Sequence, residues 1–251
     1  MTMKATKQVR DRVPSKATRA VLWPLAALPV LALALAGCGG SDGGSDSGPT
    51  GPSSAKPGTT TPTVEVVASG FGQRDAYVQG IAIVTSADKA AVGEFATVSM
   101  NFLDETGATL GTEEQTEQFS WVNQQLVLPV WLDLSSTDPK AKVAKIEVSA
   151  TLSDNGSSAS SRPELASVET TTIGDDADGS TTATFELTNS GSEDLKDLRV
   201  GVVCYDADQA IIGGTSEYPD LVAAGKTVRI DADVVTSGTP ASCTAYPNYG
   251  D

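Results

Sequence analysis

"VGVVCYDADQAIIGGTSE", residues 200–217, decides the fold, because a related stretch lies 102 residues earlier. Residues 98–114 read "VSMNFLDETGATLGTEE", so Asp104 aligns with Asp206, and a glycine follows seven residues after the aspartate in both. Each stretch has an apolar run, a turn rich in Asp, Gly or Ala, and a second run, which predicts two strands joined by a turn. A repeat of about 100 residues indicates two copies of one domain rather than a solenoid.

The chain beyond residue 63 is built from short Val-, Ile-, Thr- and Phe-rich runs separated by Gly, Asp, Asn and Ser. Turn signals every ~8–12 residues are typical of β-sandwiches. The sequence therefore predicts an all-β protein with two tandem immunoglobulin-like β-sandwich domains, over residues 64–154 and 164–251, joined by a linker at 155–163. The strands expected in the second domain are Leu165–Ile173, Thr182–Thr188, Leu198–Asp206, Ile211–Glu217, Thr227–Val235 and Ser242–Tyr246.

The strand expected at Leu198–Asp206 shows which side chains face the core. Val200, Val202 and Cys204 share one face by the two-residue period of a strand, and we expect that face to be buried. Phe102 occupies the position of Cys204 in the first domain, where its ring is expected to fill the equivalent space.

The N-terminal segment has the order of a secretory signal peptide. Residues 4–19 contain six Lys or Arg and one Asp, and the apolar run 21–36 follows. Those 16 residues would span about 24 Å as a helix, less than the ~30 Å hydrocarbon core. "LAGC", residues 35–38, resembles a bacterial lipobox, which implies cleavage before Cys38 and diacylation of its thiol. The alternative is an uncleaved signal anchor with an incidental cysteine.

This interpretation places the protein on the outer side of the cell membrane. Residues 1–37 are the expected signal peptide, and the Gly/Ser/Pro/Thr-rich residues 38–63 are the expected tether. The membrane is the expected partner through diacylglycerol on Cys38, since two acyl chains anchor stably where one does not.

The charge excludes one class of partner. The chain has 17 basic and 32 acidic residues, for a net charge of −15, and removal of residues 1–37 leaves −20. An acidic surface of this size repels nucleic acid and anionic lipid headgroups, so no nucleic-acid partner is expected.

The remaining cysteines, Cys204 and Cys243, form an even pair in an exported chain, which predicts a disulfide. Closing that loop is expected to stabilise the fold by roughly 4 kcal/mol. A structural zinc site is the poorer alternative, because the chain has no histidine to complete the ligand set.

The second domain resembles the FxLYD family of bacterial extracellular domains, common in actinobacterial and other Gram-positive lipoproteins. The resemblance lies in "NSGSEDLKDL" at 189–198, in Tyr205-Asp206 at the end of a strand, and in the "AGK" turn at 224–226. At the four positions that name the family this chain has Val202, Cys204, Tyr205 and Asp206. The resemblance implies a β-sandwich at the cell surface and no established enzymatic activity.

Catalytic candidates are few. The absence of histidine removes Ser-His-Asp and Cys-His catalysis. Glu113, Glu114 and Glu117 cluster among Thr, Gln and Gly, where no apolar pocket is expected to raise a carboxyl pKa, so a solvated edge strand is the preferred interpretation.

Two further groups are candidate binding residues, each with a plainer alternative. Asp175, Asp176 and Asp178 precede a glycine and offer oxygen ligands for calcium, although the EF-hand pattern is missing and Asp and Gly also form ordinary turns. Trp121 and Trp131 are a candidate sugar-stacking platform, or else pack against the neighbouring domain. No cofactor is expected.

The function expected from the sequence is non-catalytic binding or scaffolding in the cell envelope, with an envelope protein or glycan as the partner. Two alternatives remain: a carboxylate-dependent hydrolase acting on cell-wall glycan, and an accessory binding component of a transporter. The hydrolase requires two acids about 5–10 Å apart in a cleft.

Overall fold

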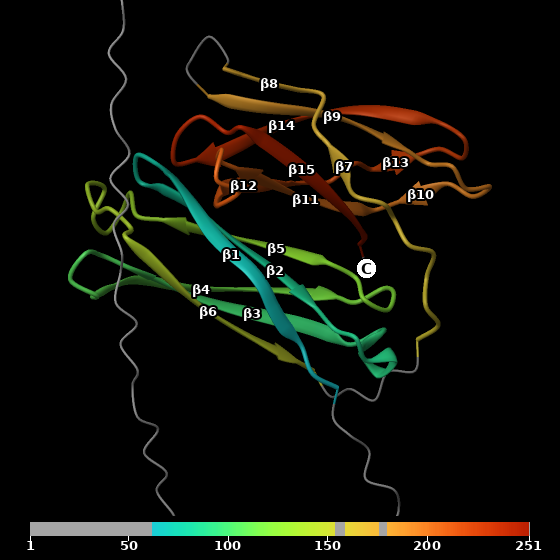
Figure 1. The fold of residues 1–251 in the computed structure, drawn as a ribbon, viewed down its shortest axis with the longest axis horizontal. Helices are drawn as coiled ribbons and strands as arrows, with labels where there is room; N and C mark the ends of the chain where they lie inside the picture. Colours follow the sequence, from blue (N-terminus) through green and yellow to red (C-terminus); the bar gives the residue numbers. More distant parts are fainter. Residues whose placement is uncertain (1–61, 154–158, 176–179, 251) are drawn as a thin grey trace, which may run out of the picture. The chain divides into compact units, whose positions relative to one another are not determined.

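The computed structural model describes residues 62–153, 159–175 and 180–250 (Figure 1). These residues form strands, connecting turns and one short 3-10 helix, η1 Lys89–Ala91, between β2 and β3. The first half comprises β1 Glu65–Arg74, β2 Tyr77–Thr85, β3 Phe95–Leu103, β4 Thr109–Gln118, β5 Leu126–Asp133 and β6 Lys145–Leu152. The second half comprises β7 Val168–Glu169, β8 Thr172–Asp175, β9 Thr181–Thr188, β10 Leu195–Lys196, β11 Leu198–Tyr205, β12 Ile211–Glu217, β13 Leu221–Val222, β14 Thr227–Thr236 and β15 Ser242–Tyr249. The predicted all-β fold class is confirmed.

The two halves have the same order of antiparallel strands. The first half has the sheets β1-β2-β5 and β4-β3-β6, and the second has a single sheet in the order β7-β15-β11-β12-β14-β9-β8, with β10-β13 as a small addition. In that long sheet β12 pairs with β14 only through Gly213 and Gly214. The sheet curls at this joint, so that β8-β9-β14 corresponds to β1-β2-β5, and β12-β11-β15 to β4-β3-β6.

The sequence repeat is also a repeat of strand register. Phe102 pairs with Gly111 in the first half, as Cys204 pairs with Gly213 in the second, and in each ladder the register shifts just after this pair. The following turns also match. Asp104 accepts hydrogen bonds from the backbone N–H groups two and four residues later, at 2.8 and 2.9 Å, and Asp206 does the same at 2.9 and 2.9 Å. Each carboxylate thus closes the same Asx-type turn.

Each half encloses its own apolar core between facing strands. The first contains the inward side chains of β2, β3 and β5, including the fully buried ring of Phe102. The second contains Val200, Val202 and Cys204, which confirms the face predicted for this strand. The first core consists of Ala76, Val78, Ala82, Val84, Ala91, Ala96, Val98, Met100, Phe102, Phe119, Leu126, Leu128, Val130, Leu132, Leu134 and Val143.

A third apolar cluster joins the halves. Ile81, Ile83 and Val127, on the outward face of the first half's β2 and β5, pack with Val203, on the outward face of β11. All four are buried, and the described residues of both halves belong to one compact unit. The proposed division into two domains stays a prediction, and residues 155–158 of its linker lie outside the described residues.

Glycines bring the two outward faces close together. A Cβ on Gly201 of β11 would lie 2.7 Å from Cβ of Val127, and one on Gly72 of β1 would lie 2.6 Å from the carbonyl oxygen of Ile212. Separations this short exclude any side chain, so glycine at these positions sets the distance between the sheets.

Buried amides complete this junction. Gln124 Nε2 donates to Asn248 Oδ1 at 2.7 Å, and Gln124 Oε1 accepts from the backbone N–H of Ser120 at 2.7 Å. The two amide side chains are 1% and 6% exposed, and their mutual bonding satisfies polar atoms that would otherwise be costly to bury.

One predicted strand is two short strands in the structure. The segment expected as a single strand, Leu165–Ile173, is divided between β7, which pairs with β15, and β8, which pairs with β9. Between them Thr170 N–H donates to Cys243 O and Thr171 N–H to Thr184 O, at 3.0 and 2.7 Å. The chain crosses here from one end of the curled sheet to the other, because the backbone groups of two successive threonines bond to β15 and to β9.

The predicted disulfide is present in the structure. Cys204 of β11 and Cys243 of β15 are directly opposite in the strand register, with Cα atoms 4.1 Å apart, and both side chains lie in the second core. The bridge therefore joins neighbouring strands of one sheet and ties the C-terminal strand to a central one.

Replacing Gly201 with valine is expected to lower the free energy of unfolding by about 1–3 kcal/mol, the usual cost of overpacking. The new side chain would overlap Val127. Gly174→Val is the matched control, since a Cβ there meets nothing within 4 Å. Urea titration measures both, and equal midpoints for the two variants would contradict the packed junction.

Replacing both bridged cysteines with alanine is expected to cost roughly 4 kcal/mol of stability, because the unfolded chain gains the freedom of an unclosed loop. The loop spans 39 residues. Chemical denaturation with and without reductant measures the loss. Reductant should lower the midpoint of the native protein and leave the double variant unchanged; an unchanged native midpoint would count against a stabilising bridge.

Candidate functional site

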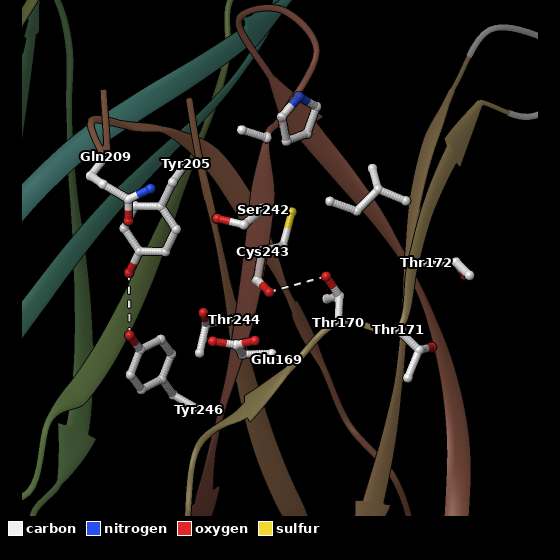
Figure 2. A pocket seen from close by; sticks show the side chains of 13 residues that line it. Glu169, Thr170, Thr171, Thr172, Tyr205, Gln209, Ser242, Cys243, Thr244 and Tyr246 are labelled. Atoms are coloured by element: carbon white, nitrogen blue, oxygen red, sulfur yellow. Dashed lines mark hydrogen bonds between the residues drawn. The ribbon is translucent and has the colours of Figure 1, made fainter. Parts of the chain in front are cut away.

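The candidate site is an open groove of about 670 Å³ at one end of the β7-β15-β11 face (Figure 2). Its lining is mostly hydroxyl-bearing. The residues are Glu169, Thr170, Thr171, Thr172, Ile173, Tyr205, Gln209, Pro240, Ala241, Ser242, Cys243, Thr244 and Tyr246.

Two tyrosines form one side of the groove. Tyr205 stands on the outward face of β11 and Tyr246 on that of β15, and their hydroxyl oxygens are 3.2 Å apart (Figure 2). Burial, and then the hydrogen bond to Tyr246, raises the pKa of Tyr205 above its usual value. The Tyr205 phenol is therefore neutral at physiological pH. A phenol hydroxyl can both donate and accept a hydrogen bond.

The opposite side is the segment that crosses from β7 to β8. Thr170 donates both its backbone N–H and its hydroxyl to the carbonyl of Cys243, at 3.0 and 3.1 Å. Figure 2 shows Ser242, Thr244 and Glu169 between the tyrosines and this segment. The disulfide-bonded strand thus forms the floor, and the crossing of β7 to β8 forms a wall.

The groove is suited to binding polar groups. Among the described residues that line it, Glu169 is the one carboxylate, and hydroxyl groups with the amide of Gln209 supply the remaining polar side chains. Acid–base hydrolysis needs a second carboxyl group placed across the substrate. Hydroxyl and amide groups instead offer hydrogen bonds to an uncharged polar ligand.

The sequence pointed to only part of this groove. Period two along β11 placed Tyr205 on the face opposite the core, but nothing in the sequence showed that Tyr246 would lie beside it. Their proximity follows from the pairing of β11 with β15, in which Cys204 stands opposite Cys243.

The two candidate tryptophans are not brought together as a platform. Trp121 is 8% exposed and makes an edge contact with Tyr249, at 6.2 Å between ring centroids. Trp131 is 48% exposed and stacks on Tyr77. Packing therefore explains the position of Trp121, whereas Trp131 stacks on Tyr77 and not on Trp121.

The calcium candidate is only partly described. Asp175 accepts a hydrogen bond from the Thr181 hydroxyl at 3.1 Å across the β8–β9 pair, while Asp176 and Asp178 lie outside the described residues. Within the described ranges, no three His, Cys, Asp or Glu side chains gather as a metal site requires. Cys38, the predicted lipidation site, also lies outside those ranges.

The glutamate cluster lies on an edge strand. Glu113 and Glu114 are exposed on β4, which pairs with β3 alone. Glu117, at the other end of that strand, forms a nearly buried ion pair with Arg199 of β11. The sequence did not predict this pair, because its partners come from different halves.

The charged side chain of Arg199 is almost completely buried. Its Nη2 donates to the Ser216 hydroxyl at 3.3 Å, its guanidinium lies 5.6 Å from the ring centroid of Tyr218, and Nε has no acceptor in the described part of the chain. Burial lowers the pKa of this guanidinium below its usual value. Glu117 thus supplies the compensating charge for a cation that is largely out of water.

Glu117→Gln is expected to destabilise the fold by about 3 kcal/mol, because it leaves a buried guanidinium without its counter-charge. Glu113→Gln, on the exposed part of the same strand, should change stability by under ~0.5 kcal/mol. Thermal or urea unfolding of the two variants checks the difference. Comparable midpoints would show that the ion pair contributes nothing.

Comparisons with known proteins add no family. No family model and no curated protein matches the chain. Among solved structures, a β-glucuronidase from glycoside hydrolase family 2 is similar over 68% of this chain and 21% of that chain, with 10% identity and a TM-score of 0.22. The chain thus spans about a fifth of that enzyme, and a likeness this distant supports no statement about activity.

Proposed function

We propose that this chain is a lipid-anchored protein of the cell envelope that binds or scaffolds without catalysis, facing the extracellular side of the membrane. The observation that carries the proposal is the order of the N-terminal sequence: a basic segment, an apolar run, "LAGC" at residues 35–38, and a Gly/Ser/Pro/Thr-rich stretch before the first strand. This order is that of a lipoprotein signal followed by a tether. Across the described residues, no helix is long and apolar enough to cross a membrane.

The groove supports binding as the activity. Its hydroxyl and amide groups match the hydrogen-bonding needs of a polar ligand, and its single carboxylate adds little charge. A rigid body of packed sheets also keeps such a surface in one geometry, which lowers the entropic cost of binding.

The hydrolase alternative rests on a different pair of acids. Burial, and then the charge of Asp233, raises the pKa of Glu217 above its usual value, a pattern also found in catalytic carboxyl pairs. Neither residue lines the groove, however, so these acids do not act on a ligand held there. Binding therefore has the stronger support.

The test is metabolic labelling of cells with a clickable fatty acid. The native protein should carry the label and sediment with membranes, and Cys38→Ser should lose both properties, because the thiol that would be acylated is gone. A Cys38→Ser protein that remains labelled and membrane-bound would refute the anchor.

The bridged cysteines provide the control. The double alanine variant at Cys204 and Cys243 retains Cys38 and should keep its label, since a disulfide-bonded sulfur is not available for acylation. Loss of label from this variant at normal protein levels would assign the modification to the wrong cysteine.

A further inference from the structure

Tyr77 and Trp131 form an exposed aromatic pair on the outward face of β2 and β5. Their ring centroids are 5.5 Å apart and their planes are inclined by 25°. The two residues are 41% and 48% exposed, among the few large apolar side chains in solvent. Stacking covers one face of each ring, and the rest of each side chain remains partly exposed to solvent.

The fold itself does not require aromatic residues at this place. Gln79 and Trp131 are paired across β2 and β5, and the equivalent pair of the second half is Thr182 and Asp233 across β9 and β14. Those two side chains are joined by a hydrogen bond of 3.2 Å. The same strand geometry is thus maintained with a polar side chain, Asp233, at the counterpart of Trp131.

The pair continues a surface that is otherwise covered. Along the same face of β5, Val127 and Pro129 are buried, and Val127 belongs to the cluster that joins the halves. Trp131 is the next outward residue and the first to emerge. The aromatic pair therefore stands at the rim of the junction, on a sheet held rigid from behind by the first core.

Charged groups of both signs border the rings. Strand register places Arg74 on one side of Tyr77 and Asp133 on the other. Hydrogen bonds from Ser135 lower the pKa of Asp133, which is fully exposed, so this carboxylate is ionised at neutral pH and accepts hydrogen bonds. An aromatic surface thus lies beside a guanidinium donor and a carboxylate acceptor.

We propose that Tyr77 and Trp131 are a stacking platform for a neutral glycan. The apolar C–H face of a pyranose ring packs on an aromatic face, while its peripheral hydroxyls need both donors and acceptors, which Arg74 and Asp133 supply. The net charge of −15 disfavours anionic polymers. This inference rests on the proposed binding function and adds to it a second surface, apart from the groove, with a stated ligand class.

Charge also separates this occupant from a membrane surface. Exposed Tyr and Trp side chains are common at lipid interfaces, but those surfaces attract basic segments. Here Asp133 is paired with Tyr77 in the strand register, and Asp75 lies in the turn before Tyr77; both are exposed. An anionic bilayer would be repelled at this position, whereas an uncharged sugar would not.

The experiment measures how much of the full chain, kept soluble in detergent micelles, is retained by insoluble cellulose and by insoluble chitin. The native protein should be retained on at least one of them. Trp131→Ala and Tyr77→Ala should each weaken retention by about tenfold, the loss expected for one stacking partner. Trp131→Phe, which keeps a ring, should retain an intermediate affinity.

Tyr218→Ala is the matched control, because Tyr218 is also an exposed aromatic residue, at 65%, but its ring contacts the Arg199 guanidinium rather than this pair. It should bind the polysaccharide as the native protein does. Unfolding midpoints of all variants establish that the fold is intact, and protection of Trp131 from acrylamide quenching by soluble cello- or chito-oligosaccharides provides a second readout that a merely unfolded variant would not show.

Several results would overturn the proposal. Absence of retention of the native protein on both polymers would do so, as would equal retention of the native protein and the Trp131→Ala, Tyr77→Ala double variant. Trp131-dependent binding to phosphatidylglycerol vesicles alone would assign the pair to the membrane, and Trp131-dependent dimerisation without sugar binding would assign it to a second copy. Each outcome leaves the Cys38 labelling result unaffected, so failure of the glycan platform and failure of the anchor are distinguishable.

Discussion

Burial of the two outward sheet faces against each other is the constraint on which the rest of the structure depends. Ile81, Ile83 and Val127 meet Val203 in a cluster that belongs to neither half alone. Removal of apolar surface from water drives this contact. Gly201 has no side chain, which allows β11 to approach Val127 of β5 closely. The strands that form it are therefore apolar on both faces, whereas antiparallel sheets commonly have one apolar face and one face exposed to solvent.

This junction has consequences for polar groups near it. Arg199 and Glu117 come from different halves and are largely withdrawn from water, so each depends on the other for charge compensation. The amides of Gln124 and Asn248 meet the same need without charge. Such contacts specify how the halves are placed, because a shifted arrangement would leave buried polar atoms without partners.

The two halves share their turn hydrogen bonds but differ in their surface side chains. The turn aspartates Asp104 and Asp206 keep the same hydrogen bonds in both halves, since the strand register depends on them. The position of Trp131 is not constrained in this way, because its counterpart Asp233 is accommodated by the same strands. The same strand pairing therefore accepts either side chain at this surface position, so the residue there can differ without disturbing the core.

The sequence by itself determined the all-β class, most strands of the second half, the repeated turn motif, the inward face of β11 and the Cys204–Cys243 bridge, because strand period, turn residues and cysteine parity are local or countable signals. It also carries the lipobox-like segment, which is a linear motif. Only the tertiary structure decided that Trp121 is buried while Trp131 is exposed beside Tyr77, and that Tyr205 meets Tyr246. The physical reason is that period two identifies which side chains share a face, but not what covers that face: whether an apolar outward residue is buried depends on packing between segments distant in the sequence.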